Sequence, residues 1–299
     1  MTDSRTAYSI QYWLESCPQG YLKGTQFGHD RGAREPDFVL ENPVVREEAI
    51  GTTVQLVVGE RAALAASSGL INAAPDAASK TFLATQTLDE ARHVEIFTQR
   101  LFDLGVKPDE LESTIARFAN PHLVRFAEIL LEKVDRRDFI AGVVGQNIVL
   151  EGLAFSTFEM MQAANRDTNP KFSKTLSGTI ADERRHVGFG ENRIGSLVRE
   201  QPGKKPEIER MQKEMAYHML ATFADRFRGQ ANAMREARRL AEEQARKEGH
   251  PTHSHVWHGT DLTTADPAEM EAVLAETVLK EFKTRLARIG LDYQSPERP

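Results

Sequence analysis

Two short motifs in this 299-residue chain bring together side chains that can bind metal ions. Each motif has the form Asp-Glu-x-Arg-His, and the two copies begin at Asp89 and at Asp182. On a helix, side chains three residues apart lie on one face, so the glutamate and the histidine of each copy can point at the same metal ion. The candidate ligands from the two motifs are Glu90, His93, Glu183 and His186.

A further glutamate precedes each motif, in a mostly apolar stretch with a helical pattern. Glu60 lies 30 residues before Glu90, and Glu151 lies 32 residues before Glu183. A buried carboxylate without a partner is costly, and binding to a metal ion removes that cost. The sequence therefore predicts two helical hairpins whose four glutamates and two histidines face inward and form a dinuclear metal centre.

Carboxylate and imidazole ligands suit iron and manganese, whereas structural zinc sites more often use cysteine thiolates, which these motifs lack. We therefore expect two iron ions, or one manganese and one iron ion, with open positions for water and for dioxygen as a co-substrate. The expected ligands are Glu60, Glu90 and His93 for one ion, and Glu151, Glu183 and His186 for the other. In this assignment Glu90 and Glu183 can bridge the two ions.

A histidine that binds a metal ion usually donates its other ring N–H to a carboxylate or a carbonyl. Asp89 and Asp182 are the expected partners, each for the histidine of the opposite copy. One Glu-x-x-His motif alone is weak evidence, because such a match arises by chance in a glutamate-rich chain with 9 histidines. The alternative is a solvated helical face with Glu–Arg pairs. Repetition of the whole motif, with a matched glutamate before each copy, favours the metal centre.

The composition is that of an ordinary globular protein, with 40% hydrophobic and 27% charged residues. A net charge of −6 gives no general attraction to nucleic acids or to anionic membranes. No apolar run is expected to reach the roughly 20 residues that a membrane-spanning helix needs. The single cysteine, Cys17, excludes an internal disulfide and fits a reducing compartment. We expect a cytoplasmic protein that binds neither nucleic acid nor membrane.

The elements that position these ligands are predicted to be helices. Capping and turn residues such as Asn42-Pro43, Pro75-Asp76 and Asn120-Pro121 separate stretches with helical patterning. The ligand-bearing helices are expected at residues 43–73, 77–104, 137–164 and 170–199, with further helices from 108, from 121, over 206–248 and over 267–289. No strand is expected. The chain then divides into an N-terminal arm (1–40), a metal-binding helix bundle (41–205) and additional C-terminal helices (206–299), in an all-α fold.

The glutamates and the two Glu-x-x-His motifs resemble those of the dimetal-carboxylate proteins of the ferritin-like superfamily. The stretches Asn147–Gly152 and Asp182–His186 are especially similar to the small subunit of class I ribonucleotide reductase and to the related ligand-binding oxidases. The likeness covers residues 45–200. It implies a ferritin-like helix bundle, a di-iron or manganese–iron centre, and the activation of dioxygen.

Three positions depart from the patterns of these relatives. The reductase subunit has its radical tyrosine one turn after the first motif's histidine, where this chain has Phe97, as does a reductase subgroup with a manganese–iron centre. The ligand-binding oxidases crosslink a tyrosine to a valine, and this chain has Gln146 at the tyrosine position, with Ala62 and Ala63 near the valine position. The related arylamine N-oxygenases have an additional histidine where this chain has Thr179. The resemblance therefore predicts neither that tyrosyl radical nor that crosslink.

Small side chains follow Glu60 and Glu151 by one or two turns, and phenylalanines accompany them. Together they can line an apolar cavity beside the metal ions, although close helix packing explains the small residues equally well. The residues concerned are Ala62, Ala63, Ala65, Ala66, Gly152, Ala154, Phe97, Phe155 and Phe189. Gln146, Thr179 and Phe97 are the candidates for the inner wall. Such a cavity fits an oxidase or oxygenase that acts on a small, partly apolar organic substrate and receives electrons from a separate donor.

Two other functions agree with the same ligands. A reductase-type subunit would generate a radical or another oxidant for a partner subunit, docking through a tail that includes Tyr293. A ferritin-type protein would take up iron, although the length of the chain counts against it. We expect a homodimer, the commonest symmetric assembly. The loop from His250 to His258 lacks carboxylate or cysteine partners, so we interpret it as a polar loop rather than a second metal site.

Overall fold

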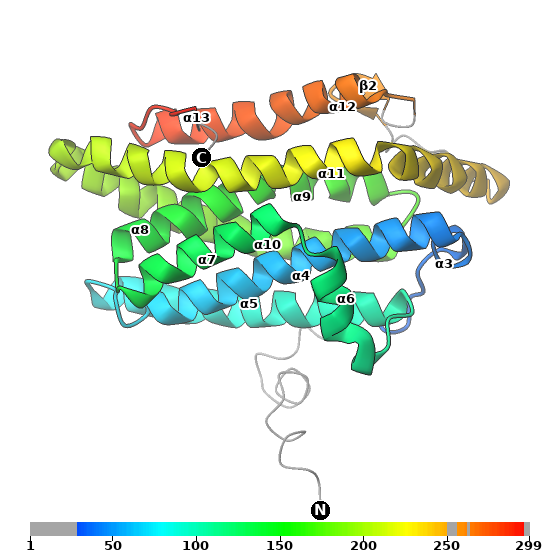
Figure 1. The fold of residues 1–299 in the computed structure, drawn as a ribbon, viewed down its shortest axis with the longest axis horizontal. Helices are drawn as coiled ribbons and strands as arrows, with labels where there is room; N and C mark the ends of the chain where they lie inside the picture. The colour runs from blue at the N-terminus through cyan, green and yellow to red at the C-terminus, as the bar shows by residue number, and fades with distance from the viewer. Residues whose placement is uncertain (1–28, 250–255, 262–263, 296–299) are drawn as a thin grey trace, which may run out of the picture.

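The computed structural model describes residues 29–249, 256–261 and 264–295, and helices make up nearly all of this part (Figure 1). The central bundle consists of two hairpins, in which α4 packs along α5 and α9 packs along α10. The bundle helices are α4 (Pro43–Leu70), α5 (Ala77–Asp103), α9 (Glu151–Asn165) and α10 (Pro170–Glu200). The two predicted hairpins are thus present, and the all-α fold class is confirmed.

Polar side chains cap the helices that carry the candidate ligands. Asn42 accepts hydrogen bonds from two backbone N–H groups at the start of α4, and Asp76 accepts one at the start of α5. Asn169 does the same for α10. Caps of this kind satisfy backbone donors that have no partner within the helix. The helix starts predicted after Asn42 and Asp76 are therefore confirmed.

The third helix of the bundle contains a π-helical segment that the sequence pattern does not reveal. α8 (Phe139–Val143) passes directly into η3 (Val144–Leu150), a π-helix, and then into α9. The backbone N–H of Glu151 bonds to the carbonyl oxygen of Gln146, five residues earlier. This wider turn lies immediately before a candidate metal ligand, where π-helical turns often occur.

The stretch Phe139–Asn165 also corrects the expectation that no apolar run is long enough to cross a membrane. It is the one helix in the described residues that passes this test, with a mean hydropathy of 1.4. However, 83% of its most apolar window is buried inside the protein, where α10, α11 and α4 pack against η3. A helix covered by neighbours on all sides is apolar around its whole circumference, so the composition reflects a core position.

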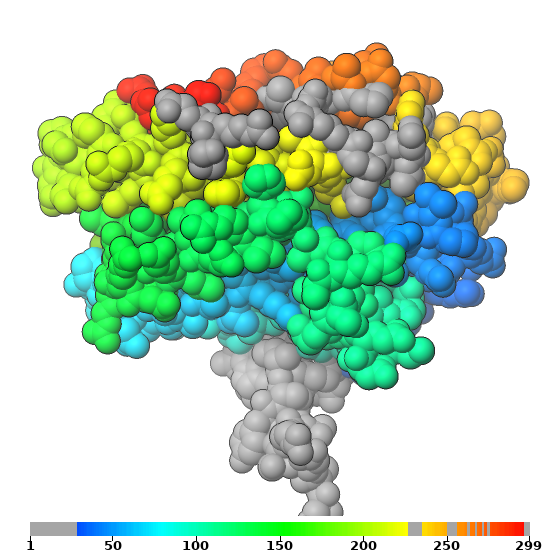
Figure 2. All heavy atoms as spheres, in the orientation of Figure 1, coloured from blue at the N-terminus to red at the C-terminus, as the bar shows by residue number. Residues whose placement is uncertain are grey.

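The remaining helices cover the bundle, and α7 and α11 form much of the face seen in Figure 2. The long helix α11 packs on α7, η3 and α4. These outer elements are α3 (Asp37–Glu41), η2 (Pro108–Glu110), α6 (Leu111–Phe118), α7 (Pro121–Asp135), η4 (Pro202–Lys204), α11 (Lys205–Lys247), α12 (Pro267–Leu274), η5 (Ala275–Leu279) and α13 (Lys280–Arg288). The domain limits at residues 40 and 205 stay predictions.

A minimal hairpin corrects the expectation that the chain has no strand. β1 (Val256–Trp257) pairs with β2 (Thr260–Asp261) in antiparallel register, and His258 lies in the turn between them with a φ of 46°. Strands of two residues are too short to show an alternating pattern. Of the predicted histidine loop, residues 250–255 lie outside the described residues, as does most of the predicted N-terminal arm.

Candidate metal centre

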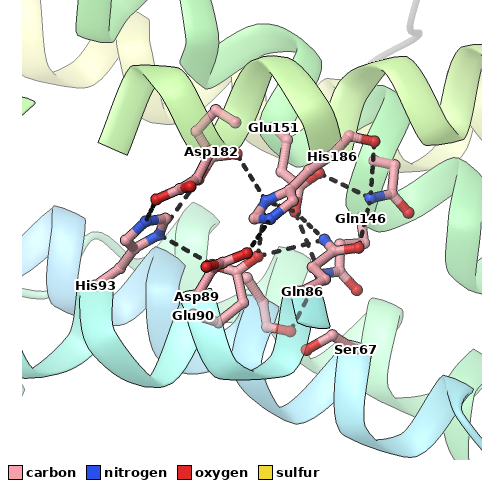
Figure 3. A network of polar contacts seen from close by, with 12 residues as sticks. Ser67, Gln86, Asp89, Glu90, His93, Gln146, Glu151, Asp182 and His186 are labelled. Carbon is pink, nitrogen blue, oxygen red and sulfur yellow. Dashed lines mark hydrogen bonds and ion pairs between the residues drawn. The ribbon is translucent and has the colours of Figure 1, made fainter. Parts of the chain in front are cut away.

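The six candidate ligands lie together in the middle of the bundle, and Figure 3 shows most of them with their polar neighbours. They come from four different helices, and none is more than 5% exposed. α4 provides Glu60, α5 provides Glu90 and His93, α9 provides Glu151, and α10 provides Glu183 and His186. Because all six side chains are buried, the repeated motif does not mark a solvated helical face, and that alternative is wrong.

One half of the cluster is centred on His93. Its Nδ1 atom lies 3.3 Å from Glu60 Oε2, 3.3 Å from Glu90 Oε2 and 3.5 Å from Glu183 Oε1. The four side chains each offer one ligand atom, and these atoms all lie within 4.8 Å of one another. This half can hold one metal ion with three carboxylates and one imidazole.

The other half is centred on His186. Its Nδ1 atom lies 3.3 Å from Glu90 Oε1 and 3.8 Å from Glu151 Oε1. Glu183 Oε2 lies 3.7 Å from the same nitrogen. Glu90 and Glu183 therefore each direct one oxygen at either histidine, which is the arrangement that bridging carboxylates require. The cluster can hold two metal ions; that these six residues are its ligands stays a prediction.

The outer nitrogen of each histidine contacts an aspartate of the opposite motif. His93 Nε2 lies 3.3 Å from Asp182 Oδ2, and His186 Nε2 lies 3.2 Å from Asp89 Oδ2. This is the crossed pairing expected from the sequence. Such a contact fixes the orientation of the imidazole ring and leaves Nδ1 as the atom that faces the centre.

The arginines of the two motifs hold these aspartates in place. Arg92 donates a hydrogen bond to Asp182, and Arg185 donates one to Asp89. The Arg92 side chain is 7% exposed, whereas that of Arg185 is 50% exposed. Burial acts to raise the pKa of Asp182, but its contact with His93 and the charge of Arg92 outweigh burial and lower that pKa. The repeated Asp, Glu, Arg and His of the motif thus all take part in one arrangement.

Three buried amides surround Glu151, two of which the sequence analysis did not single out. Gln86 Nε2 donates to Glu151 Oε1 over 2.6 Å, and Asn147 Nδ2 donates to Oε2 over 2.9 Å. Gln146 Nε2 donates to Oε1 over 3.2 Å. The sequence feature that could have identified Gln86 and Asn147 is their spacing, because each precedes a candidate ligand glutamate by four residues, or about one helical turn.

Burial and mutual contacts shift the pKa values within the cluster in opposite directions. Burial raises the pKa of Glu60 to about 8, raises that of Glu151 well above its usual range, and also raises that of Glu183. Burial acts on Glu90 in the same sense, but its contacts with His186 and His93 outweigh it and hold the pKa of Glu90 well below its usual range.

The two histidines have raised pKa values despite their burial. Burial favours the neutral imidazole, but the charge of Glu60 and the contact with Asp182 raise the pKa of His93 well above its usual range. Contacts with Asp89 and with the central glutamates do the same for His186. Without metal ions, the cluster therefore balances its carboxylates with protons on imidazoles and on glutamates.

Unpaired polar atoms in the cluster fit a pair of metal ions. Glu90 Oε2, His93 Nδ1, Glu183 Oε2 and His186 Nδ1 are buried and have no hydrogen-bond partner. Buried polar atoms are nearly always paired, and all four of these atoms face the centre. Two divalent ions would give each of them a partner, and their four positive charges would balance the four carboxylates.

An apolar cavity of about 260 Å³ reaches the cluster between α4, α9 and α11. Three carboxylates of the cluster border it, namely Glu60, Glu151 and Glu183. Its nearby wall consists of small and apolar residues, among them Gly59, Ala63, Leu150, Ala154, Phe158 and Met160. A small organic molecule in this cavity would lie directly beside the candidate metal ligands.

The predicted cavity wall is correct at two positions only. Ala63 and Ala154 line the cavity. The predicted wall residues that lie elsewhere are Ala62, Ala65, Ala66, Phe97, Gln146, Gly152, Phe155, Thr179 and Phe189. Phe97 and Phe155 pack in an apolar cluster formed by α4, α5, α9 and α10, whereas the cavity lies towards α11. Phe189 stacks on Phe82 with the ring centroids 4.1 Å apart.

Solved structures of other proteins match this chain over most of its length, although no family model and no curated protein matches its sequence. A variant of an R2-like ligand-binding oxidase with an aerobically reconstituted Mn/Fe cofactor is 18% identical, with a TM-score of 0.63 over 94% of this chain and 91% of that one. Another variant, with an anaerobically reconstituted Mn/Fe cofactor, is 20% identical, with a TM-score of 0.63 over 95% and 94%. A Synechococcus protein with aldehyde deformylating oxidase activity is 17% identical, with a TM-score of 0.60 over 86% and 95%.

The chain has a ferritin-like helix-bundle fold. The resemblance drawn from the repeated motifs is thereby confirmed at the level of fold. At sequence identities of 17 to 20%, the activity of these proteins cannot be assigned to this chain. The reaction has to be inferred from the buried cluster and from the cavity beside it.

Replacing Asp89 by asparagine is expected to weaken metal binding by the cluster about 10- to 100-fold. The asparagine keeps the shape of the side chain but loses the negative charge that contacts His186 Nε2 and Arg185. Titration of metal-free protein with Mn²⁺, followed by the electron paramagnetic resonance of the free ion, measures the effect. Asp109→Asn, at an exposed position in η2, is the matched control. Equal affinities in the two variants would contradict the role given to Asp89.

Metal binding is also expected to tighten as the pH rises. With a pKa of about 8, Glu60 carries a proton at neutral pH in the metal-free protein, and the raised pKa values keep His93 and His186 protonated as well. Each ion must displace such protons, so the affinity should rise by about tenfold per pH unit for each proton displaced. Calorimetric titration between pH 6 and pH 8 in buffers of different ionisation enthalpy measures the protons released. An affinity independent of pH would contradict the expectation.

Proposed function

We propose that this protein is a dioxygen-activating dimetal oxidase or oxygenase that acts on an elongated, mainly apolar organic substrate. One observation carries the proposal: the apolar cavity borders Glu60, Glu151 and Glu183, three carboxylates of a cluster that can hold two metal ions. A protein that only stores iron has no need of an apolar chamber beside its ligands. An enzyme that oxidises a bound organic molecule requires one.

The residues of this chain would bind the cofactor and control access to it. Four glutamates and two histidines would hold the two ions, and Asp89 and Asp182 would orient the imidazole rings. When bound, two iron ions, or one manganese and one iron ion, supply the redox chemistry by which dioxygen is activated. The apolar wall around Ala154 and Phe158 would exclude water and place the substrate.

The shape of the cavity supports an elongated substrate. Its lining on α4 extends from Val45 to Ala63, a span of about 27 Å along a helix with a rise of 1.5 Å per residue. The far end is more polar, because Glu48, Thr52 and Arg226 border it and bond to one another there. A molecule with a long apolar part and few polar groups would match this lining.

The nature of the ions is supported by the known structures and by the donor set. The two oxidase variants of similar fold carry Mn/Fe cofactors, and carboxylates with imidazoles suit both metals. We propose a di-iron or a manganese–iron centre with dioxygen as co-substrate. Reduction of the centre would require an electron donor. A homodimer and a cytoplasmic location remain part of the proposal.

Oxygen consumption by the metal-loaded protein tests the proposed function. Protein loaded with Fe²⁺, or with Fe²⁺ and Mn²⁺, would be exposed to oxygen with and without a series of elongated apolar compounds. Oxygen use and product formation that depend on one compound would support an oxidase or oxygenase. A persistent radical or mixed-metal oxidant without any substrate would favour a ribonucleotide reductase-type subunit that serves a partner. Growth of an iron mineral would favour a ferritin-type iron-handling protein.

A further inference from the structure

The two halves of the centre differ in the hydrogen bonds made by the glutamate that belongs to one half only, which is Glu151 in one half and Glu60 in the other. Glu151 accepts hydrogen bonds from three amide groups, on Gln86, Gln146 and Asn147. Glu60 stands at the equivalent place in the other half, where its Oε2 atom lies 3.3 Å from His93 Nδ1. The repeated motifs therefore produce a centre that is symmetric in its ligands and asymmetric in the support of those ligands.

The π-helical segment explains why two consecutive residues can reach Glu151. In an α-helix, successive residues are about 100° apart around the axis, so a residue five positions earlier points about 140° away. In the π-helix η3 the bonds run between residues five apart, and the N–H of Glu151 bonds to the carbonyl oxygen of Gln146. Gln146 and Asn147 are thereby both brought onto the face of Glu151.

The three amides are themselves fixed by further bonds. Gln146 Nε2 also donates to the carbonyl oxygen of Ala63 on α4 over 3.2 Å. Asn147 Nδ2 also lies within hydrogen-bond distance of Gln86 Oε1 (3.2 Å) and of the carbonyl oxygen of His186 (3.3 Å), so its two N–H groups are shared among three acceptors. All three amide side chains are completely buried. Their positions are therefore set by α4, α5 and α10 together.

Gly190 gives this segment the space that it needs. A Cβ atom added at Gly190 would lie 2.5 Å from Asn147 Cβ and 3.2 Å from Ile148 Cδ1. Contacts below 3 Å between carbon atoms require a displacement, here of the π-helical backbone itself. The close approach of α10 to η3 is thus part of what holds the three amides around Glu151.

The hydrogen bonds limit what Glu151 can do as a ligand. An ionised carboxylate offers about four acceptor positions, and the three amides occupy three of them. Oε1 accepts two of these bonds and Oε2 accepts one, so about one position is left for a metal ion, on Oε2, and Glu151 can bind through that oxygen only. Any rotation of its carboxylate would break hydrogen bonds from buried amide donors and leave those donors unpaired, which is costly inside a protein.

Glu60 has the opposite properties. No amide in the described residues donates to it, and it borders the apolar cavity. A Cβ atom added to its neighbour Gly59 would meet no atom within 4 Å, so there is open space beside this turn of α4. Glu151 also borders the cavity, but its oxygens are held. Rotation of the Glu60 carboxylate therefore breaks no hydrogen bond from an amide in the described residues.

We propose that Gln86, Gln146 and Asn147 are positioning residues that fix Glu151 as a ligand binding through one oxygen, and that Glu60 is the carboxylate that changes orientation when the centre is filled. The inference rests on the proposed function, because it requires two metal ions in the cluster. It assigns the rigid side of the centre to the His186 half and the adaptable side to the His93 half, next to the cavity.

Crystal structures of the full-length protein, metal-free and loaded with Mn²⁺, test the geometry. In the loaded protein we expect Glu151 to keep its hydrogen bonds from all three side-chain amides and to bind one ion through one oxygen. We expect the Glu60 carboxylate to rotate. A Glu151 that chelates an ion or leaves the amides, or a Glu60 that keeps its orientation, would overturn the inference.

Titration of variants with Mn²⁺ tests the positioning role without using activity. We expect Gln146→Met and Asn147→Ala to weaken the binding of one of the two ions about 10- to 100-fold, with less than a threefold change for the other ion. Gln162→Met is the matched control, since Gln162 on α9 donates a hydrogen bond to Ser177 Oγ on α10, away from the cluster. Equal weakening of both ions would indicate general destabilisation and would overturn the inference, as would variants identical to the control.

The same titration distinguishes a failure of the inference from a failure of the proposed function. Wild-type protein that binds fewer than two ions per chain would overturn the proposed function together with the inference. Wild-type protein that binds two ions, while Gln146→Met behaves like Gln162→Met, would overturn the inference alone.

Discussion

Glu90→Ala is expected to reduce metal binding from two ions per chain to less than one at micromolar metal concentrations. Glu90 is the residue shared by both groups of candidate ligands, with Oε2 3.3 Å from His93 Nδ1 and Oε1 3.3 Å from His186 Nδ1. Its removal would take away a carboxylate that both ions could share. A metal ion contributes several kcal/mol to catalysis, and 1.36 kcal/mol corresponds to a factor of ten, so substrate-dependent oxygen use should fall about a thousandfold or more.

Elemental analysis after dialysis measures this effect, with Glu95→Ala as the control on the same helix. Glu95 bonds to Gln99 at the half-buried surface of α5 and does not belong to the cluster. Heating curves give an independent measurement, because ions that bind only the folded state raise its stability. The wild type should melt at a higher temperature with Mn²⁺ than without it, and Glu90→Ala should not. A Glu90→Ala protein that still holds two ions would exclude Glu90 as the bridging ligand.

The ligand cluster could be predicted from the sequence because its information is local and is written twice. Each Glu-x-x-His motif fixes two ligands through the period of a helix, and the preceding glutamate fixes the partner helix of the same hairpin. Two such hairpins have few ways to bury four carboxylates other than around shared ions. The same reasoning predicted that Asp89 and Asp182 exchange partners between the copies, since the two motifs face each other.

The support of Glu151 could not be predicted in the same way. A π-helical turn depends on how many residues fit between packed helices, and the close approach of Gly190 to Asn147 is a contact between distant parts of the chain. Gln146 was predicted to line a cavity wall because it stands at the tyrosine position of the ligand-binding oxidases, and a regular α-helix would have turned it away from Glu151. Gln86 was missed because a single buried glutamine has no pattern of its own.

The cavity could not be predicted from the sequence either, because a small residue lines a cavity only if the helix opposite leaves space beside it. Alanines near Glu60 and Glu151 occur on several faces of α4 and α9, and only Ala63 and Ala154 of the predicted set face the space beneath α11. Residues of α11 such as Met219 and Thr222 complete the wall. They carry no signal that would connect them to the metal centre in the sequence.

Ala154→Phe is expected to leave both metal ions bound and to lower substrate-dependent oxygen use about a hundredfold, the effect of misplacing a bound substrate by about 1 Å. Ala154 lies one turn after Glu151 and lines the cavity, so a phenyl ring there would fill the space beside the ligands. The ring enters an existing void, which should keep the cost to stability near or below the 1–3 kcal/mol typical of overpacked cores. Metal content and oxygen consumption, measured on the same preparation, give the result.

Ala181→Phe is the control, because Ala181 is exposed on α10 next to the second motif and adds the same ring outside the cavity. Gly59→Leu blocks the cavity from the opposite wall, where an added Cβ meets no atom within 4 Å. A variant on α9 alone could lower turnover by displacing Glu151. Variants on α9 and on α4 have in common only that each fills the cavity. If both lose turnover and keep their ions, the substrate occupies that space. If both retain full turnover with intact metal content, the reaction takes place elsewhere and the proposed substrate site is wrong.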